Sequence, residues 1–172
     1  GELKETDEDL AADMFELAMD LTRTAGYQQY EISNYCLPGR ECVHNLIYWH
    51  NQPYLGFGIS ASSFMEGTRW THTTSLTEYI RTASSGLVAR VCQEKLNDRE
   101  ALGEAIMLGL RTEKGISTAA LSSRYSFDVA SLFSQTFQSL GHNGFLLQEG
   151  ERVRLTRRGK MMANDVCAQF LV

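Results

Sequence analysis

The residues of this chain best suited to chemistry lie in three polar-aromatic clusters between residues 30 and 64. A buried ligand needs a few convergent polar groups among apolar walls, and these clusters supply both. The clusters are Glu31, Asn34 and Tyr35, then His44, Asn45, Tyr48 and Trp49, and then the glycine-rich segment 54–64 with Gly58, Ser60 and Ala61. Their composition favours a ligand site over a plain core.

The first cluster ends a short apolar and aromatic stretch that predicts a strand over residues 27–35. At the carboxyl end of a strand in an α/β protein, Glu31 could accept hydrogen bonds from an ammonium group or a ribose hydroxyl of a ligand. The alternative is a strand end whose polar residues face solvent or cap the next helix.

The second cluster has helical spacing. His44 and Tyr48 would share one face of a short helix over residues 44–51, and Asn45 and Trp49 another. Aromatic rings beside an imidazole could hold a flat macrocycle, with His44 as an axial ligand to iron. The alternative is an aromatic anchor in the core, with His44 bonded to a backbone carbonyl.

The third cluster reads as a buried strand over residues 54–64, in which glycines indicate close approach of a ligand or another backbone. Its Gly-x-Gly is not followed by a dinucleotide-binding fingerprint. Cys36, Cys42 and His44 could join a zinc site, although their spacing matches no common zinc module. Four cysteines in 172 residues make no disulfide framework and indicate a reducing, cytoplasmic location.

The composition bounds the class of protein. The chain is 43% hydrophobic and 22% charged, as expected for a soluble globular protein. It is shorter than a complete (β/α)8 barrel of about 250 residues. Its apolar runs fall short of the roughly 18 residues of a membrane span, and its acidic start does not resemble a signal peptide.

The elements that would position the clusters follow from periodicity and caps. Residues 7–25 predict an amphipathic helix, capped by Thr6 or Asp7. A hairpin around Glu66-Gly67 and a helix over residues 77–84 complete this part. The inward face of the first helix would carry Leu10, Met14, Leu17, Ala18, Leu21 and Ala25.

The character of the chain changes after an expected linker at residues 85–98. Three helices, capped by Asp98, Ser117 and Asp128, precede a hairpin over residues 146–155. Thr156 would cap a last helix. Its inward residues would be Met162, Val166 and Phe170. This order predicts a small winged-helix-like domain.

Charge divides the chain at the same place. Residues 1–98 carry 7 Lys and Arg against 14 Asp and Glu, and residues 99–172 carry 9 against 7. A basic group on the predicted wing invites a nucleic-acid-binding interpretation. It comprises Arg152, Arg154, Arg157, Arg158 and Lys160. The low net charge, and Arg124 as the one cation of residues 118–140, favour a solvated face instead.

With these residues in view, the chain resembles radical S-adenosylmethionine proteins of the oxygen-independent coproporphyrinogen III oxidase family, in particular the haem chaperone branch. The resemblance spans residues 10–172 in order. Its main motifs are Tyr30-Glu31-Ile32-Ser33-Asn34-Tyr35, His44-Asn45-x-x-Tyr48-Trp49, Tyr54-Leu55-Gly56-x-Gly58-x-x-Ala61-x-Ser63, Glu66-Gly67-x-Arg69-Trp70, Met107-Leu108-Gly109-Leu110-Arg111 and Leu155-Thr156-x-x-Gly159.

The resemblance implies an α/β plus mostly α fold. Residues 1–84 would be the C-terminal strands and helices of a partial (β/α)6 radical-SAM barrel, 85–98 a linker, and 99–172 a helical, winged-helix-like domain. Truncated barrel strands would leave unpaired edges, so self-association is expected.

The resemblance also implies cofactors. In the family a CxxxCxxC loop holds a [4Fe–4S] cluster that cleaves S-adenosylmethionine; here the cysteines stand at 36, 42, 92 and 167, so the chain should be inactive alone. Haem or porphyrin would contact His44, Asn45, Tyr48 and Trp49, with His44 on the iron. The cavity for S-adenosylmethionine and substrate would be lined by Glu31, Asn34, Gly58, Ser60 and Ala61.

Two activities are compatible with the resemblance: oxidative decarboxylation of coproporphyrinogen III, and haem binding and delivery. The alternative from another class is a winged-helix nucleic-acid-binding protein.

Overall fold

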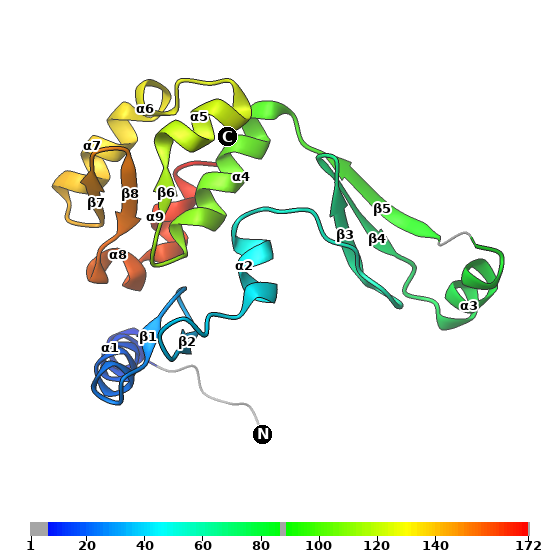
Figure 1. Cartoon of the computed structure of the whole chain (residues 1–172), viewed down its shortest axis with the longest axis horizontal. Coiled ribbons are helices and arrows are strands. Elements are labelled where there is room, and N and C mark those ends of the chain that lie inside the picture. The colour runs from blue at the N-terminus through cyan, green and yellow to red at the C-terminus, as the bar shows by residue number, and fades with distance from the viewer. Residues whose placement is uncertain (1–6, 87–88, 172) are drawn as a thin grey trace.

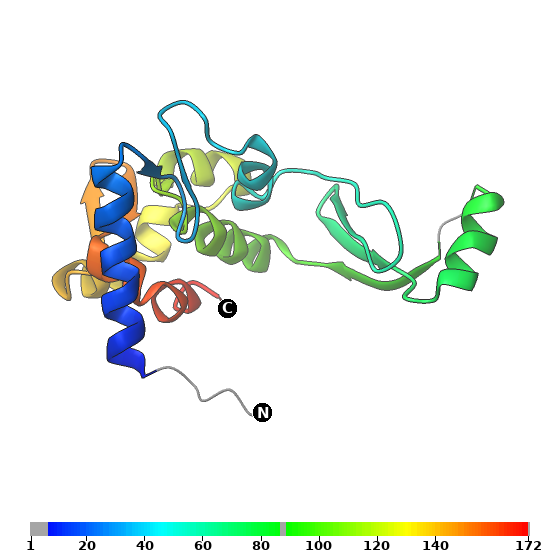
Figure 2. The ribbon, with the colours of Figure 1, turned by 90° about the horizontal axis from the view of Figure 1, so that it is seen from below.

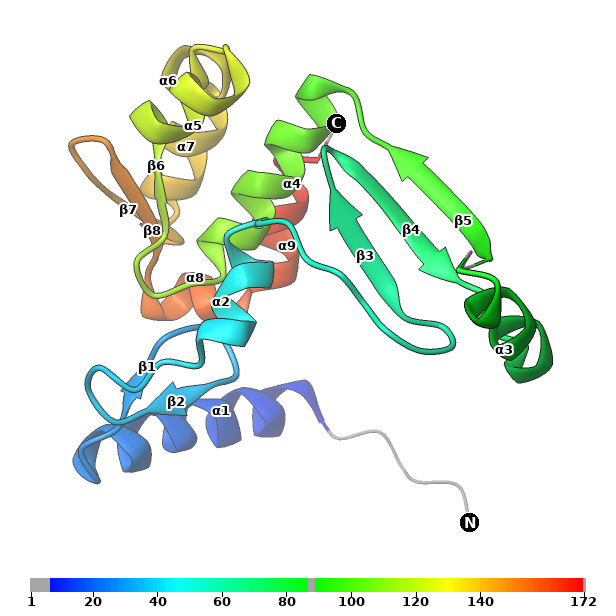
Figure 3. The same ribbon diagram turned by 45° about the vertical axis from the view of Figure 1, so that its right-hand side comes forward.

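A computed structural model describes residues 7–86 and 89–171. A helical C-terminal region stands at one end of the molecule, and an antiparallel arm projects away from it in every view (Figures 1, 2 and 3). A first helix and a small hairpin lie against the C-terminal region. The arrangement gives the polar-aromatic clusters three different supports.

The first helix, α1 (Glu8–Thr24), begins at Asp7, whose side chain accepts hydrogen bonds from the backbone N–H groups of Asp9 and Leu10. The predicted cap Asp7 is thereby confirmed, and Thr6 lies outside the described residues. The predicted inward face is wrong. Its large members, Leu10, Met14, Leu17 and Leu21, are between 53% and 60% exposed.

The opposite side of α1 faces the rest of the chain instead, with Met19 buried. Asp20 pairs with Arg157 of the C-terminal region at 2.8 Å. The predicted face stays exposed because no described residue packs against its apolar side chains. Charged contacts orient the helix instead. The view from below shows α1 lying alongside the C-terminal helices (Figure 2).

The predicted strand over residues 27–35 is also wrong. In its place, two strands of two residues each, β1 (Gln28–Gln29) and β2 (Tyr35–Cys36), pair antiparallel on either side of a turn. The turn forms because the Glu31 carboxylate accepts hydrogen bonds from the Ser33 N–H and the Asn34 amide. Such local side-chain bonds compete with an extended ladder.

The short helix α2 (Val43–Trp49) confirms the helical spacing of the second cluster. By contrast, the buried strand expected over residues 54–64 is mostly a loop. Strand β3 is Ser62–Met65, and the preceding turn holds Gly58 at φ +107° and Ser60 at φ +58°. Left-handed backbone at two positions is incompatible with a continuous strand.

The arm is a three-stranded antiparallel sheet in the order β3-β4-β5 with helix α3 (Leu76–Ser84) at its far end (Figure 3). Glu66 and Gly67, both at positive φ, join β3 to β4 (Thr68–His72), which confirms the predicted hairpin. Strand β5 (Arg90–Lys95) lies within the expected linker, where it pairs with β4.

The C-terminal region begins with α4 (Asp98–Leu110), whose cap is Asn97 in a capping box with Glu100 rather than Asp98. A three-stranded sheet in the order β6-β8-β7 packs among the helices. The remaining elements are β6 (Ile116–Ser117), α5 (Thr118–Tyr125), α6 (Val129–Leu132), α7 (Ser134–His142), β7 (Leu146–Glu149), β8 (Arg152–Leu155), α8 (Arg157–Met161) and α9 (Ala163–Ala168).

Two predicted helices of this region are each split in two, at Phe133 and at Met162. Met162 is 43% exposed, so its predicted inward position is wrong, whereas Val166 and Phe170 are buried as expected. The caps Ser117, Asp128 and Thr156 are confirmed. One buried apolar cluster, running from Leu102 to Phe170, lies wholly within this region.

The close packing of this region is visible at Gly115. Its backbone lies at φ +60°, and a Cβ there would stand 2.1 Å from the Val153 carbonyl oxygen. Across the described ranges, no helix is both long and apolar enough to span a membrane.

Candidate functional site

A row of aromatic rings connects α2 with the arm. The rings of His44 and Tyr48 meet edge to face at 5.0 Å, and the Tyr48 hydroxyl lies 3.3 Å from His44 Nε2. The ring centroids of Tyr48 and Tyr54 lie 4.6 Å apart, and those of Tyr54 and Phe64 of β3 lie 6.3 Å apart. His44 is exposed and Tyr48 is 37% exposed. The row therefore offers an imidazole and a phenol ring to solvent on one helix face.

The other face of α2 anchors the helix. The Asn45 amide donates a hydrogen bond of 3.1 Å to the hydroxyl of Tyr30, which is buried. Trp49 is half-buried on the same side. The second cluster thus divides into an exposed pair, His44 and Tyr48, and a supporting pair, Asn45 and Trp49.

The glycine-rich loop is held on the arm by a set of bonds that the sequence did not reveal. The Gly58 N–H donates to the Tyr79 hydroxyl at 3.0 Å, and the Gly58 carbonyl oxygen lies 3.1 Å from Nδ1 of buried His72. The Gly56 N–H donates to Ser63 Oγ, and the Ser60 N–H to the Thr73 carbonyl, both at 3.0 Å. These contacts fix the backbone around Gly58, Ser60 and Ala61.

Glu31 and Asn34 lie elsewhere, against the C-terminal region. Glu31 is only 2% exposed, and its neighbour Ile32 donates a backbone hydrogen bond of 3.1 Å to the Arg111 carbonyl. The turn and the arm are far apart in the views of Figures 1 and 3. The structure therefore does not bring Glu31 and Asn34 together with Gly58, Ser60 and Ala61.

Tyr35 differs from its cluster neighbours because its hydroxyl is buried without a hydrogen-bond partner in the described part of the chain. Burial, with a smaller contribution from the Glu31 carboxylate, raises the pKa of Tyr35. Tyr35 lines a cavity of about 460 Å³ between α1 and the C-terminal region.

The cysteines show no metal-binding arrangement. Within residues 7–86 and 89–171, no three His, Cys, Asp or Glu side chains are grouped to hold an ion. Cys42 and Cys92 are exposed, and Cys36 and Cys167 are buried. Burial raises the pKa of the Cys167 thiol to about 11, as expected for a small core residue.

The basic group at the wing is used within the chain. Arg157 bonds Asp20 and Glu16, and Lys160 bonds Glu113 and the Gln29 side chain. The other three are engaged inside the C-terminal region: Arg158 stacks on Phe145 at 4.8 Å, Arg154 faces Glu149 at 3.9 Å, and Arg152 donates to the Lys114 carbonyl. Arg157 and Lys160 thereby join the C-terminal region to the earlier part of the chain.

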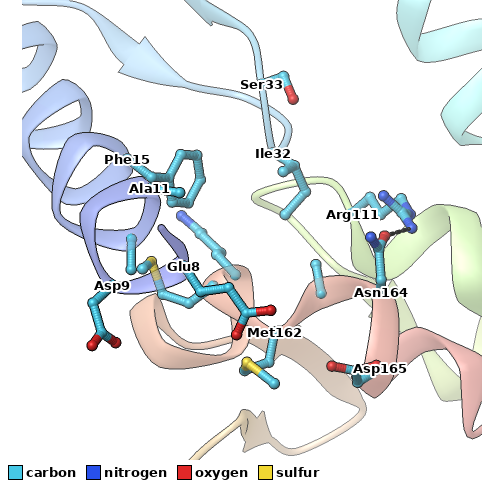
Figure 4. Close-up of a pocket in the computed structure, with 14 residues that line it drawn as sticks. Glu8, Asp9, Ala11, Phe15, Ile32, Ser33, Arg111, Met162, Asn164 and Asp165 are labelled. Carbon is cyan, nitrogen blue, oxygen red and sulfur yellow. Dashed lines mark hydrogen bonds between the residues drawn. The ribbon is translucent and has the colours of Figure 1, made fainter. Parts of the chain in front are cut away.

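A larger groove, of about 770 Å³, runs between α1 and α8–α9 (Figure 4). Phe15 and Ile32 contribute to its apolar lining, and the Arg111 guanidinium donates to Asn164 Oδ1 at 2.6 Å. Glu8, Asp9 and Asp165 give its rim an acidic character. Neither cavity contains a residue of the aromatic row.

Comparison with known proteins shows which proteins this chain is similar to. Residues 96–162 match the HemN C-terminal domain. The whole chain is 31% identical to the heme chaperone HemW of Lactococcus lactis, covering 45% of that protein. It is 33% identical to HemW of Bacillus subtilis over 99% of the chain and 45% of that protein.

A solved structure agrees at the level of the fold. Coproporphyrinogen III oxidase (HemN) of Escherichia coli, a radical SAM enzyme, superposes with a TM-score of 0.71 at 14% identity, covering 92% of this chain and 40% of that one. The class defined by these matches is that of radical S-adenosylmethionine proteins. Within it, the chain is similar to HemN- and HemW-like proteins. It spans about half the length of the curated relatives it matches.

Proposed function

We propose that this chain belongs to a haem- or porphyrin-handling protein and that the exposed face of α2 binds the macrocycle. The observation that carries the proposal is the row of His44, Tyr48 and Tyr54. It combines an accessible imidazole with aromatic rings, the groups that ligate iron and contact a flat apolar ring.

The residues present fit such a group. His44 Nε2 is bonded only to the exposed Tyr48 hydroxyl among the described residues, so a modest rotation of either side chain would free it. Haem, when bound, would supply an iron that an imidazole nitrogen such as that of His44 could ligate. Asn45 and Trp49 would hold the helix from behind, consistent with the bond from Asn45 to Tyr30.

Delivery of haem is favoured over oxidation of a porphyrinogen, because the relatives similar over the full chain are named heme chaperones. Decarboxylation of coproporphyrinogen III, the chemistry of the structural relative's name, is the second candidate. Either way the proposal concerns the longer protein of which such a region forms part.

Radical S-adenosylmethionine proteins use S-adenosylmethionine and an iron–sulfur cluster. We propose that Gly58, Ser60 and Ala61 line the approach to S-adenosylmethionine, since a Cβ at Gly58 would meet no atom within 4 Å. The Asn34 amide donates a hydrogen bond to the Glu31 carboxylate, and both residues lie apart from the loop around Gly58. Their part in the S-adenosylmethionine site is therefore a separate proposal. The CxxxCxxC loop is not among these 172 residues.

We further propose that residues 1–84 are part of a (β/α)6 barrel and residues 99–172 a winged-helix domain, with 85–98 connecting them through β5. Supporting the second assignment, a helix, a strand, further helices and a hairpin follow each other, and the sheet order is β6-β8-β7. Nucleic-acid binding is disfavoured because the basic wing residues already have partners.

The exposed α1 stripe and the outer edge of β5, unpaired within the described chain, support self-association of these 172 residues. Light scattering at rising concentration would test this, with a strictly monomeric chain as the contrary result.

The binding proposal is tested by titrating haemin into the wild-type chain, His44→Ala and His142→Ala. His142 is an exposed histidine on α7, far from the aromatic row, and serves as the control. We expect a saturable Soret shift in the wild type and in His142→Ala, and a weaker, displaced band in His44→Ala. An unchanged titration in His44→Ala removes its role as ligand.

A further inference from the structure

The arm and the segment after helix α2 both contact one carboxylate of the C-terminal region, and the arm and α2 carry the two groups of proposed ligand residues. Glu104 of α4 accepts hydrogen bonds from both terminal nitrogens of Arg69, at 2.9 and 3.1 Å. It also accepts a bond of 3.3 Å from the Asn51 amide, two residues beyond the end of α2. Three segments distant in sequence therefore meet at Glu104.

The bond to the arm is well suited to fixing an orientation. Two parallel N–H···O bonds define both distance and angle, which a single contact does not. The side chains of Arg69 and Glu104 are 33% and 14% exposed, so competition from water is limited. The hydrogen bond to Glu104 also raises the pKa of Arg69. The same guanidinium lies over the Phe64 ring at 5.5 Å.

The bond to α2 is equally constrained. Asn51 is 4% exposed and adopts a left-handed backbone, φ 49°, which is unusual for a residue other than glycine. Arg124 of α5 donates to the Asn51 carbonyl at 2.8 Å and to the His50 carbonyl at 3.3 Å. The chain just after α2 is thus held by a cation that bonds the carbonyl groups of the two residues following the helix.

These contacts close a ring. From α2, the aromatic row passes through Tyr48, Tyr54 and Phe64 to Arg69, and from Arg69 the ion pair leads through Glu104 and Asn51 back to α2. A change in the distance between the arm and α2 must alter either the row or the ion pair. Glu104 is the member of the ring that belongs to the tightly packed region.

We propose that Glu104 is a positioning residue that couples the arm to α2, so that a ligand held on the aromatic row is sensed at the glycine-rich loop. This inference rests on the proposed function for its ligand, but the coupling itself is a property of the free chain. No residue of the ring other than Tyr48 and Tyr54 needs to touch the macrocycle.

Amide hydrogen exchange of the ligand-free chain tests the coupling first. In Glu104→Gln, we expect faster exchange in both residues 43–51 and residues 62–72, with the C-terminal core unchanged. Glu94→Gln, an exposed carboxylate on β5 of the same arm, is the matched control and should behave as wild type. Wild-type exchange of both segments in Glu104→Gln overturns the inference.

Arg69→Lys provides a second variant that keeps the charge and removes the two-pronged bond. Combined with Glu104→Gln, it should add little to either single change, because both remove the same interaction. Fully additive effects would show that the two side chains act independently. Far-UV circular dichroism of each variant verifies that the helices are retained.

The ligand experiment uses haemin. In the wild type, haemin should slow exchange in α2 and also in residues 56–61 of the arm. In Glu104→Gln it should still protect α2, with affinity weaker on the order of tenfold, within the range for residues that act through a network, and no longer protect residues 56–61. Protection of both segments in the variant overturns the coupling. If the wild type does not bind haemin, the proposed function is refuted, and the exchange experiment on the ligand-free chain alone decides the role of Glu104.

Discussion

The C-terminal region and the part before it stabilise themselves in different ways. Residues 98–171 bury a continuous apolar cluster in which Leu102, Ile106, Val129 and Phe170 are fully enclosed. In the earlier part, the buried residues are mixed, and polar ones such as Glu31, Asn51 and His72 slightly outnumber the apolar ones. Among the described residues, only Leu147, Met162 and Leu171 of the later region are large exposed hydrophobics; the rest lie before residue 97.

This difference indicates that the geometry of the two parts is set in different ways. A dense apolar core holds its own shape. A part that buries hydrogen-bonded polar groups and exposes apolar ones has a geometry set by specific bonds, such as those on Glu31, Gly58 and Glu104. We infer that residues 7–96 present surfaces to other groups and that residues 98–171 provide the fixed support for them.

The largest expected effect comes from changing a phenylalanine in each part. Phe170→Ala should destabilise the chain by about 3–5 kcal/mol, because it removes a fully buried ring from the core. Phe57→Ala, at a ring that is 85% exposed, should change stability by less than about 0.5 kcal/mol. Urea denaturation followed by far-UV circular dichroism measures both. Similar losses for the two variants would remove the contrast between the regions.

A glycine change in the arm tests whether the two parts unfold separately. In Gly56→Ala, the new Cβ would stand 2.2 Å from the Ser62 carbonyl oxygen, so the loop must move away from β3. Both tryptophans, Trp49 and Trp70, lie outside the C-terminal region and report only on the earlier part. We expect altered tryptophan fluorescence with an unchanged urea transition of the C-terminal helices. A shifted helical transition would show that the regions unfold together.

A smaller effect is expected where α1 meets the C-terminal region. The contact is charged and exposed, with Arg157 bonded to Asp20 and Glu16, so salt should weaken it. Arg157→Ala should speed amide exchange in the second half of α1 and abolish its salt dependence. Arg158→Ala is the control, since its partners Phe145 and Asn143 lie within the C-terminal region. Equal effects of the two changes would contradict this role.

The smallest effect concerns pH. Hydrogen bonds from the Ser131 hydroxyl and N–H hold the pKa of Asp128 below its ordinary value. A lowered folded-state pKa contributes stability above the unfolded pKa of about 3.9, and this contribution is lost as pH falls through the folded value. Asp128→Asn keeps a capping side chain without the charge, so it should be less stable than wild type at pH 7 and equal to it at strongly acidic pH. Thermal melts at both pH values measure the difference.

Local signals made the helices predictable. The caps Asp7, Ser117, Asp128 and Thr156 bond backbone groups two or three residues away, so the sequence alone locates them. The hairpin at Glu66-Gly67 was equally readable, since two positive φ angles favour such a dipeptide. Helical spacing also placed His44 and Tyr48 on one face.

What depends on distant residues was not predictable. The loop around Gly58 takes its shape from His72 and Tyr79, and β5 forms only because β4 is available as its partner. Glu104 shows no special pattern in the sequence, since its partners Arg69 and Asn51 are 35 and 53 residues away. Contacts of that range become visible only in three dimensions.

The most direct test of the account is the resonance Raman spectrum of the ferrous haem complex, which contains an iron–histidine stretching band when an imidazole is the axial ligand. We predict this band in the wild-type chain and in His142→Ala, and its loss in His44→Ala. A band that persists in His44→Ala would show that the iron is held elsewhere and would contradict the assignment of the α2 face as the macrocycle site.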